Sequence, residues 1–156
     1  MGAARTSAGV LLWRRRDGGV EVLLGHPGGP FFARKDAGVW SVPKGETGPG
    51  EDDLEAVARR EFEEETGHAP PDGPTIDLGE VRQAGGKLVV CWAIEGDLDP
   101  GEAVSNTFEM EWPPRSGRTQ EFPEIDRVAW FDPATARVAI NPAQETFLDR
   151  LDEALR

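Results

Sequence analysis

The sequence has little of several residue types that common metal and stabilising sites require. Its 156 residues contain one cysteine, Cys91, and two histidines, His26 and His68. A single cysteine excludes an intramolecular disulfide and a cysteine-ligated zinc site, and two distant histidines argue against a histidine-rich metal centre. Cys91 lies within an apolar run, so we expect a buried, unreactive thiol.

Long hydrophobic runs and an excess of positive charge are also missing. No apolar stretch approaches the roughly 20 residues of a membrane span, and the run 8–13 is too short for a secretory signal and precedes its arginines. The net charge is −12, from 17 Lys and Arg against 29 Asp and Glu. We therefore predict a cytoplasmic protein that binds neither nucleic acid polymers nor membranes. An anionic substrate would need metal ions or local cations to hold it.

The length and the pattern of apolar residues predict one domain over 1–156, with a flexible tail at 1–6. Five Trp and seven Phe argue against disorder. The expected order is strands, one acidic helix, more strands and a C-terminal helix, which is an α/β or α+β fold. We expect strands at 7–13, 20–24, 40–42, 78–83, 87–95, 105–112 and 126–131, a loop at 113–123, and helices at 54–66, 133–138 and from 141 onward.

The chain is organised around residues 45–67, a Gly/Pro loop that leads into a helix. Asp52 or Asp53 is the expected N-cap, and Gly67 the expected C-cap. At 100° per residue, one stripe of this helix begins with apolar residues and ends with carboxylates. The members of that stripe are Leu54, Val57, Ala58, Glu61, Glu64 and Glu65.

These carboxylates repel one another and lie near the negative end of the helix dipole, where each anion loses roughly 0.3–1 kcal/mol. A bound divalent cation would remove the conflict, because Mg²⁺ takes hard oxygen ligands together with substrate phosphates. The alternative is an acidic, solvated helix end. The apolar start of the same stripe weakens that alternative.

The stretch from Gly45 to Gly67 resembles the Nudix box, G-x5-E-x7-R-E-U-x-E-E-x-G-U, and the lead-in Trp-Ser-Val-Pro-Lys-Gly at 40–45 is also similar to Nudix hydrolases. Two departures are visible. Eight residues separate Glu51 from Arg60 where the family has seven, so either Glu51 or Asp52 takes the position that pairs with the box arginine. His68 stands where the family has an aliphatic residue.

The resemblance implies an α/β/α sandwich with a mixed sheet and dependence on Mg²⁺, with Mn²⁺ as a substitute. It also implies metal ligands at Glu61, Glu64 and Glu65 and at a backbone carbonyl near Lys44 or Gly45. It makes Arg60 part of the catalytic group, with Glu64 or Glu65 as the general base. A further acid would come from Glu51 or from a later loop, where Glu124 is our first choice among Glu109, Glu111, Glu121 and Glu124.

Cations and aromatic residues near this stretch are candidates for substrate binding. Lys44, Arg34, Lys35, Arg115 and Arg118 could hold outer phosphates, although for any one of them we favour a plain surface cation. For Phe32, stacking on a base and anchoring its own loop are both open. Trp40 is a further substrate-binding candidate.

The family implies hydrolysis of a diphosphate linkage in a nucleoside diphosphate derivative by attack of water on phosphorus. Nucleoside triphosphates and dinucleoside polyphosphates are our first expectation, while nucleotide sugars and ADP-ribose also fit the motif. One alternative is a regulatory Nudix module that binds a nucleotide without hydrolysing it. Another is an acidic interaction protein without a ligand. The oligomeric state is left open, with a homodimer as one option.

Overall fold

The computed structural model describes residues 5–156, and most of the predicted tail at 1–6 falls outside this range. Thr6 already belongs to the first strand. The strands are β1 (Thr6–Arg16), β2 (Gly19–Pro27), β3 (Lys44–Glu46), β4 (Thr75–Arg82), β5 (Leu88–Glu95), β6 (Thr107–Glu111), β7 (Thr119–Pro123) and β8 (Ile125–Phe131). The α-helices are α1 (Leu54–Thr66), α2 (Pro133–Ala139) and α3 (Glu145–Ala154), and none of the helices described is long and apolar enough to cross a membrane.

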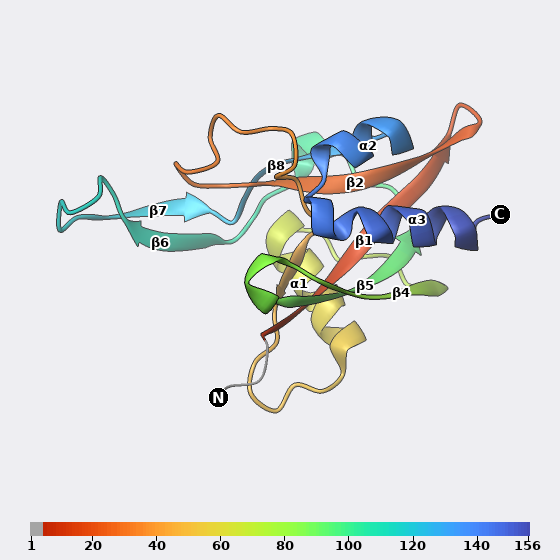
Figure 1. The fold of residues 1–156 in the computed structure, drawn as a ribbon, viewed down its shortest axis with the longest axis horizontal. Coiled ribbons are helices and arrows are strands. Elements are labelled where there is room, and N and C mark those ends of the chain that lie inside the picture. Colours follow the sequence, from red (N-terminus) through yellow and green to blue (C-terminus); the bar gives the residue numbers. More distant parts are fainter. Residues whose placement is uncertain (1–4) are drawn as a thin grey trace.

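A mixed sheet forms the middle layer, in the order β4-β5-β1-β2-β8. Strand β1 is central: it pairs in parallel with β5, and in antiparallel fashion with β2 at one end and β3 at the other. Helix α1 covers one face, and α2 with α3 covers the other (Figure 1). The predicted α/β/α sandwich with a mixed sheet is confirmed.

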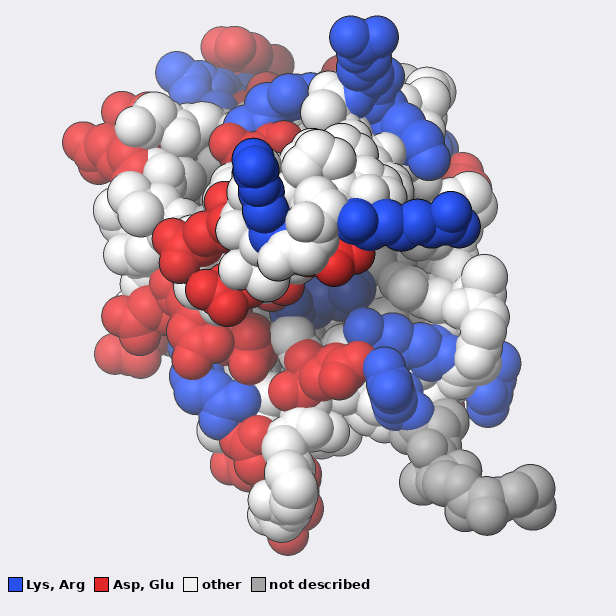
Figure 2. Space-filling view, turned by 90° about the vertical axis from the view of Figure 1, so that its left-hand side faces the viewer, with Lys and Arg blue, Asp and Glu red and all other residues white. Residues whose placement is uncertain are grey.

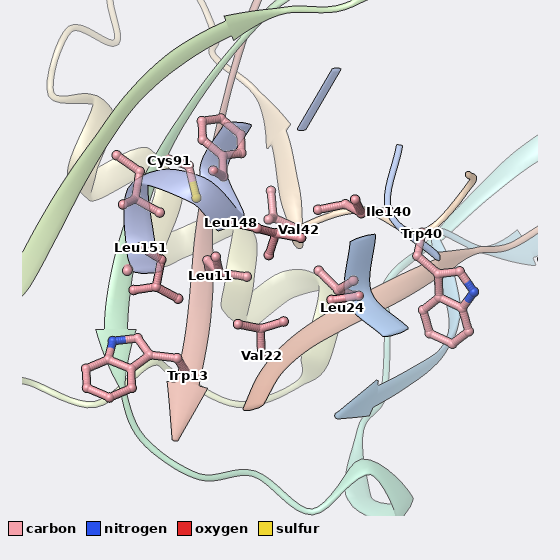
Figure 3. Close-up of a cluster of buried hydrophobic side chains, with 14 of the residues drawn as sticks. Leu11, Trp13, Val22, Leu24, Trp40, Val42, Cys91, Ile140, Leu148 and Leu151 are labelled. Atoms are coloured by element: carbon pink, nitrogen blue, oxygen red, sulfur yellow. The ribbon is translucent and has the colours of Figure 1, made fainter. Parts of the chain in front are cut away.

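The apolar run of β1 is explained by burial on both faces of the sheet. Its residues alternate, so Val10 and Leu12 pack beneath α1, whereas Leu11 and Trp13 pack beneath α3. The α3 side is the larger cluster, and Leu11 and Leu148 both belong to it (Figure 3). A strand that is covered on both faces reads as a continuous hydrophobic segment rather than an alternating one.

Helix α1 has the caps that its sequence predicts. The Asp53 side chain accepts a hydrogen bond from the Ala56 amide at 3.1 Å, which makes Asp53 rather than Asp52 the N-cap. Gly67 adopts a left-handed φ of 78°, and its amide donates to the Glu63 carbonyl at 2.8 Å. Both ends of the acidic helix are therefore fixed in position.

Two strand predictions are wrong. Residues 40–42 form only isolated bridges at Trp40 and Ser41, and the strand in this region is β3, which pairs with β1 directly after Pro43. Residues 119–123, expected as loop, form β7, which pairs with β6 in a hairpin that projects from the body (Figure 1). The segment around β7 is exposed, is rich in Pro, Gly and Arg, and shows no alternation of apolar and polar residues. Its sequence therefore does not predict a strand.

Candidate functional site

A cleft of about 480 Å³ lies where β3 crosses the N-terminal end of β1. Carboxylates from α1 and from the residue before β8 share it with two lysines. On the face of the molecule that carries the β6–β7 hairpin, acidic side chains lie mainly on one side and basic side chains on the other, with a recess between them (Figure 2). The charged residues that line the cleft are Glu46, Glu61, Glu65, Glu124, Lys44 and Lys87.

Glu65 is the most deeply buried of these acids, with 9% of its surface exposed. Its Oε2 accepts a hydrogen bond from the Lys44 amide at 2.8 Å, which ties the last turn of α1 to β3. Burial raises the pKa of Glu65 to about 8; the Lys44 charge and amide oppose this rise, and the Glu124 and Glu61 charges add to it. Burial therefore favours the neutral, protonated form of this carboxyl.

Glu61 lies against the backbone of Gly45. A Cβ atom at residue 45 would overlap the Glu61 carboxyl group, so only glycine leaves room for this acid beside β3. Burial raises the pKa of Glu61, while a hydrogen bond from Arg60 Nη2 at 3.2 Å opposes the rise. The glycine at the start of the motif thus has a steric role.

Arg60 pairs with Glu51 and not with Asp52. Both of its Nη atoms donate to the Glu51 carboxylate, with Nη2 3.3 Å from Oε1. The Gly48 amide donates to the same Oε1 at 2.6 Å. The loop before α1 therefore accommodates the extra residue while Glu51 keeps its place beside the arginine.

Glu64 is not part of the cleft lining. Its carboxylate is 3.9 Å from Arg60 Nε and about half exposed. Its main chain has a different contact, since the Glu64 carbonyl accepts from the Asn106 amide at 2.8 Å. Glu61 and Glu65 line the cleft and Glu64 does not, although the Glu64 carboxylate lies close enough to Glu61 to help raise its pKa.

Most of the predicted substrate-binding residues lie outside the cleft. Lys44 is the exception. Phe32, Arg34 and Lys35 belong to an exposed loop, and Arg115 and Arg118 lie in the turn between β6 and β7. Trp40 is 4% exposed and packs edge-on against Phe131, so it leaves no ring face for a ligand.

Among the later acids, Glu124 is the one that reaches the cleft. A series of main-chain hydrogen bonds sets its position: the Glu124 amide donates to the Asn106 carbonyl at 2.9 Å, and the Gly28 amide donates to the Glu124 carbonyl at 3.0 Å. Glu109 and Glu121 face each other on the hairpin instead. The first choice made from sequence is therefore the acid that the fold brings to the site.

Several cleft residues were missed by sequence reasoning, among them Ser7, Glu46, Lys87 and Asn106. They come from β1, β3 and the segments before β5 and β6, which are far apart in the sequence. The structural role of His26 was not predicted from the sequence either. Its Nδ1 lies 2.9 Å from Asp126 Oδ1 and its Nε2 2.7 Å from the Lys35 carbonyl, so this fully buried ring joins β2 to β8 and to the exposed loop.

The donor set fits a hard divalent cation. Glu61, Glu65 and Glu124 offer oxygen ligands in one cleft, and the space that a Cβ at Gly45 would fill is left to a carboxylate. Within residues 5–156 no three His, Cys, Asp or Glu side chains already stand as a closed ligand group. Cation binding would therefore draw carboxylates together from the positions described.

A larger groove of about 790 Å³ lies at the other end of β1. There the Arg14 guanidinium stacks over Trp130 at 4.0 Å and pairs with Asp97 and Glu21. None of the acids of the α1 stripe lines this groove. Size alone therefore does not mark the chemical site.

A family model described as the NUDIX domain matches residues 3–151. The chain therefore belongs to the NUDIX domain family. A comparison with curated protein sequences gives no significant match.

Solved structures share the fold. The NUDIX domain of NrtR from Shewanella oneidensis, solved with ADP-ribose, is 18% identical with a TM-score of 0.66, covering 100% of this chain and 91% of that chain. A C. elegans Ap4A hydrolase is 21% identical with a TM-score of 0.63, covering 97% and 98%. The C-terminal domain of mouse MUTYH, solved with human PCNA, is 16% identical with a TM-score of 0.61, covering 98% and 90%. At these identities the likeness establishes the fold alone.

Proposed function

We propose that this NUDIX protein is a Mg²⁺-dependent pyrophosphohydrolase that cleaves a diphosphate linkage in a nucleotide substrate. The observation that carries the proposal is the cleft in which Glu61, Glu65 and Glu124 face Lys44 and Lys87. Acids that would bind metal and cations that would bind phosphate are thereby placed within one cavity.

In this proposal the chain's own residues divide the work. Glu61, Glu65, Glu124 and the Gly45 carbonyl would hold Mg²⁺, for which Mn²⁺ could substitute. The bound cation supplies charge neutralisation of the diphosphate and polarisation of the attacking water. Glu65, whose Oε2 is held by the Lys44 amide, is our first candidate for the base that takes up the proton of the attacking water.

Two further residues of the motif act around this group. Arg60 holds Glu51 and fixes the orientation of Glu61. Glu64 is the second candidate for a metal ligand and base, and it would first have to turn from Arg60 toward the cleft. Separate Glu64 and Glu65 variants decide which of the two acts as the base.

The substrate class we favour is nucleoside triphosphates or dinucleoside polyphosphates. The fold neighbour that is an Ap4A hydrolase and the one solved with ADP-ribose support nucleotide chemistry in general. A panel of these compounds and of nucleotide sugars, with product identification and titration of Mg²⁺ and Mn²⁺, tests the proposal. Products cut between phosphates, formed only with a divalent cation, would support it.

Matched variants test the site itself. Glu65→Gln and Glu61→Gln should each lower kcat by roughly 10²-fold or more. Glu63→Gln is the control, because Glu63 is an exposed acid of the same helix that does not line the cleft. Full cation-dependent turnover in a folded Glu65→Gln protein would refute the assignment.

A nucleotide-binding module without hydrolysis is the second candidate. The orientation of Glu64 toward Arg60 favours it, since one acid of the stripe is then absent from the cleft. Tight binding of ADP-ribose or a nucleotide by calorimetry, with no turnover across the panel, would establish this function in place of the first.

A further inference from the structure

Ser7 has a buried hydroxyl group without a hydrogen-bond partner. The residue is fully buried near the start of β1, and within residues 5–156 its Oγ is one of two buried side-chain polar atoms that lack a partner. The great majority of buried polar side-chain atoms are hydrogen-bonded, because leaving one unpaired forfeits its hydration. Ser7 also lines the cleft, so its hydroxyl is a donor that a ligand bound there could satisfy.

The position of Ser7 on the sheet places it beside the cationic part of the cleft. It pairs with Glu46 of β3, and Gly9, two residues on, pairs with Lys44. Directly paired residues and those two apart share a face, so the three side chains of Ser7, Lys44 and Glu46 point the same way. A Cβ at Gly9 would lie 2.8 Å from the Lys44 Cβ, which agrees with this placement.

Lys87 completes this wall of the cleft. It precedes β5, in which Val89 stands next to Ser7 in the parallel ladder. Its Nζ is 3.4 Å from Glu46 Oε1, and Glu46 is also 3.7 Å from Arg5 Nη1. The one carboxylate on this wall is thus already paired with cations, while Glu61 and Glu65 line the cleft from α1.

We propose that the Ser7 hydroxyl donates a hydrogen bond to a non-bridging oxygen of a substrate phosphate seated between Lys44 and Lys87. Two lysines and a free hydroxyl suit an anionic oxygen, since hydrogen bonds to charged acceptors are the stronger ones. The described residues that line the cleft include no aromatic side chain, so the cavity takes the phosphate end and not a stacked base. This assignment rests on the proposed function for the identity of the phosphate compound.

The other unpaired buried atom provides an internal comparison. Trp13 Nε1 lies on the same strand, but Trp13 belongs to the α3-side core and does not line the cleft. Both residues therefore have an unpaired buried donor, but of the two only Ser7 belongs to the cleft lining. Trp13→Phe removes the donor at the second position and serves as the matched control.

Binding of methylenediphosphonate, a non-hydrolysable diphosphate, tests the contact directly. Calorimetry with Mg²⁺ present compares the wild-type protein with Ser7→Ala and Ser7→Cys. Cysteine nearly preserves the volume of the serine side chain, so Ser7→Cys serves as the second variant if Ser7→Ala does not fold. We expect the Kd to rise roughly tenfold to a hundredfold in both. The melting temperature without ligand should be unchanged or higher, because no partner is lost, and Trp13→Phe should leave the Kd unchanged.

The outcomes separate this inference from the proposed function. Wild-type affinity in folded Ser7→Ala and Ser7→Cys overturns the inference, and so does the absence of any diphosphonate binding by the wild-type protein. Weaker binding in the Ser7 variants, together with no hydrolysis of any nucleotide by the wild type, supports the contact and refutes only the hydrolase. Turnover with an unchanged KM and Kd in Ser7→Ala refutes only the contact.

Discussion

Replacement of Glu65 by glutamine should remove a pH dependence of stability that the fold itself creates. Burial raises the pKa of Glu65 from an ordinary 4.5 to about 8. The native protein therefore binds this proton more tightly than the unfolded chain does, and the free energy of unfolding falls as pH rises from about 4.5 to about 8. Glutamine keeps the shape of the side chain and an acceptor for the Lys44 amide, but it does not titrate.

The magnitude follows from the size of the shift. One pKa unit corresponds to about 1.36 kcal/mol, so the full shift amounts to roughly 4–5 kcal/mol when Glu65 is considered alone. Between pH 6 and pH 9 the wild type should lose roughly 2–3 kcal/mol more stability than Glu65→Gln. Burial lowers the pKa of the neighbouring Lys44, which also contributes to the wild-type slope. The measured quantity is therefore the difference between the two proteins.

Denaturant unfolding at several pH values in EDTA measures this difference. At pH 9 without metal the variant should be the more stable protein, and the two should converge toward pH 6. Saturating Mg²⁺ should restore stability to the wild type at high pH, because it binds the ionised native site. Parallel stability curves for the two proteins across this range would refute the account of Glu65.

Three further predictions concern the surroundings of the acids. Glu51→Gln should weaken Mg²⁺ affinity or activity roughly tenfold, because it releases Arg60, while Asp52→Asn should have no effect. Equal effects of the two variants in Mg²⁺ titrations would contradict the pairing of Arg60 with Glu51. Gly45→Ala should displace Glu61 and lower Mg²⁺ affinity more than tenfold, whereas Gly73→Ala, in open space, should leave it unchanged. His26→Ala should cost roughly 2–4 kcal/mol in urea unfolding, because two buried hydrogen bonds and a ring are lost; a cost below about 1 kcal/mol would count against this role.

The central helix was predictable because its signals are local. The caps at Asp53 and Gly67 and the apolar start of the stripe depend on neighbours a few residues away. The stripe also placed Glu61 and Glu65 correctly. Glu64 lies at the edge of the stripe, half-exposed, with its carboxylate 3.9 Å from Arg60 Nε, and it does not line the cleft.

The rest of the site depends on contacts between distant segments. Ser7, Lys87 and Asn106 look like ordinary polar residues in the sequence. The pairing of β1 with β3 and β5 brings Ser7 and Lys87 to the cleft, and main-chain hydrogen bonds to Glu64 and Glu124 bring Asn106 there. Trp40 shows the opposite error. An aromatic residue next to the motif was expected to bind substrate, but it packs into the core, where apolar burial outweighs its proximity to the cleft.

The hydrogen bonds that join the end of α1 to Asn106, Glu124 and Gly28 close the β6–β7 hairpin at its base. Residues 107–123 therefore form an insertion whose two ends are held by main-chain hydrogen bonds. These bonds do not depend on the side chains that the two end residues carry. Within such an arrangement the hairpin can lengthen, shorten or change its surface without moving Glu124. Evolution could thus vary the outer contacts of this protein while the acid that depends on the hairpin's base stays in register with the helix.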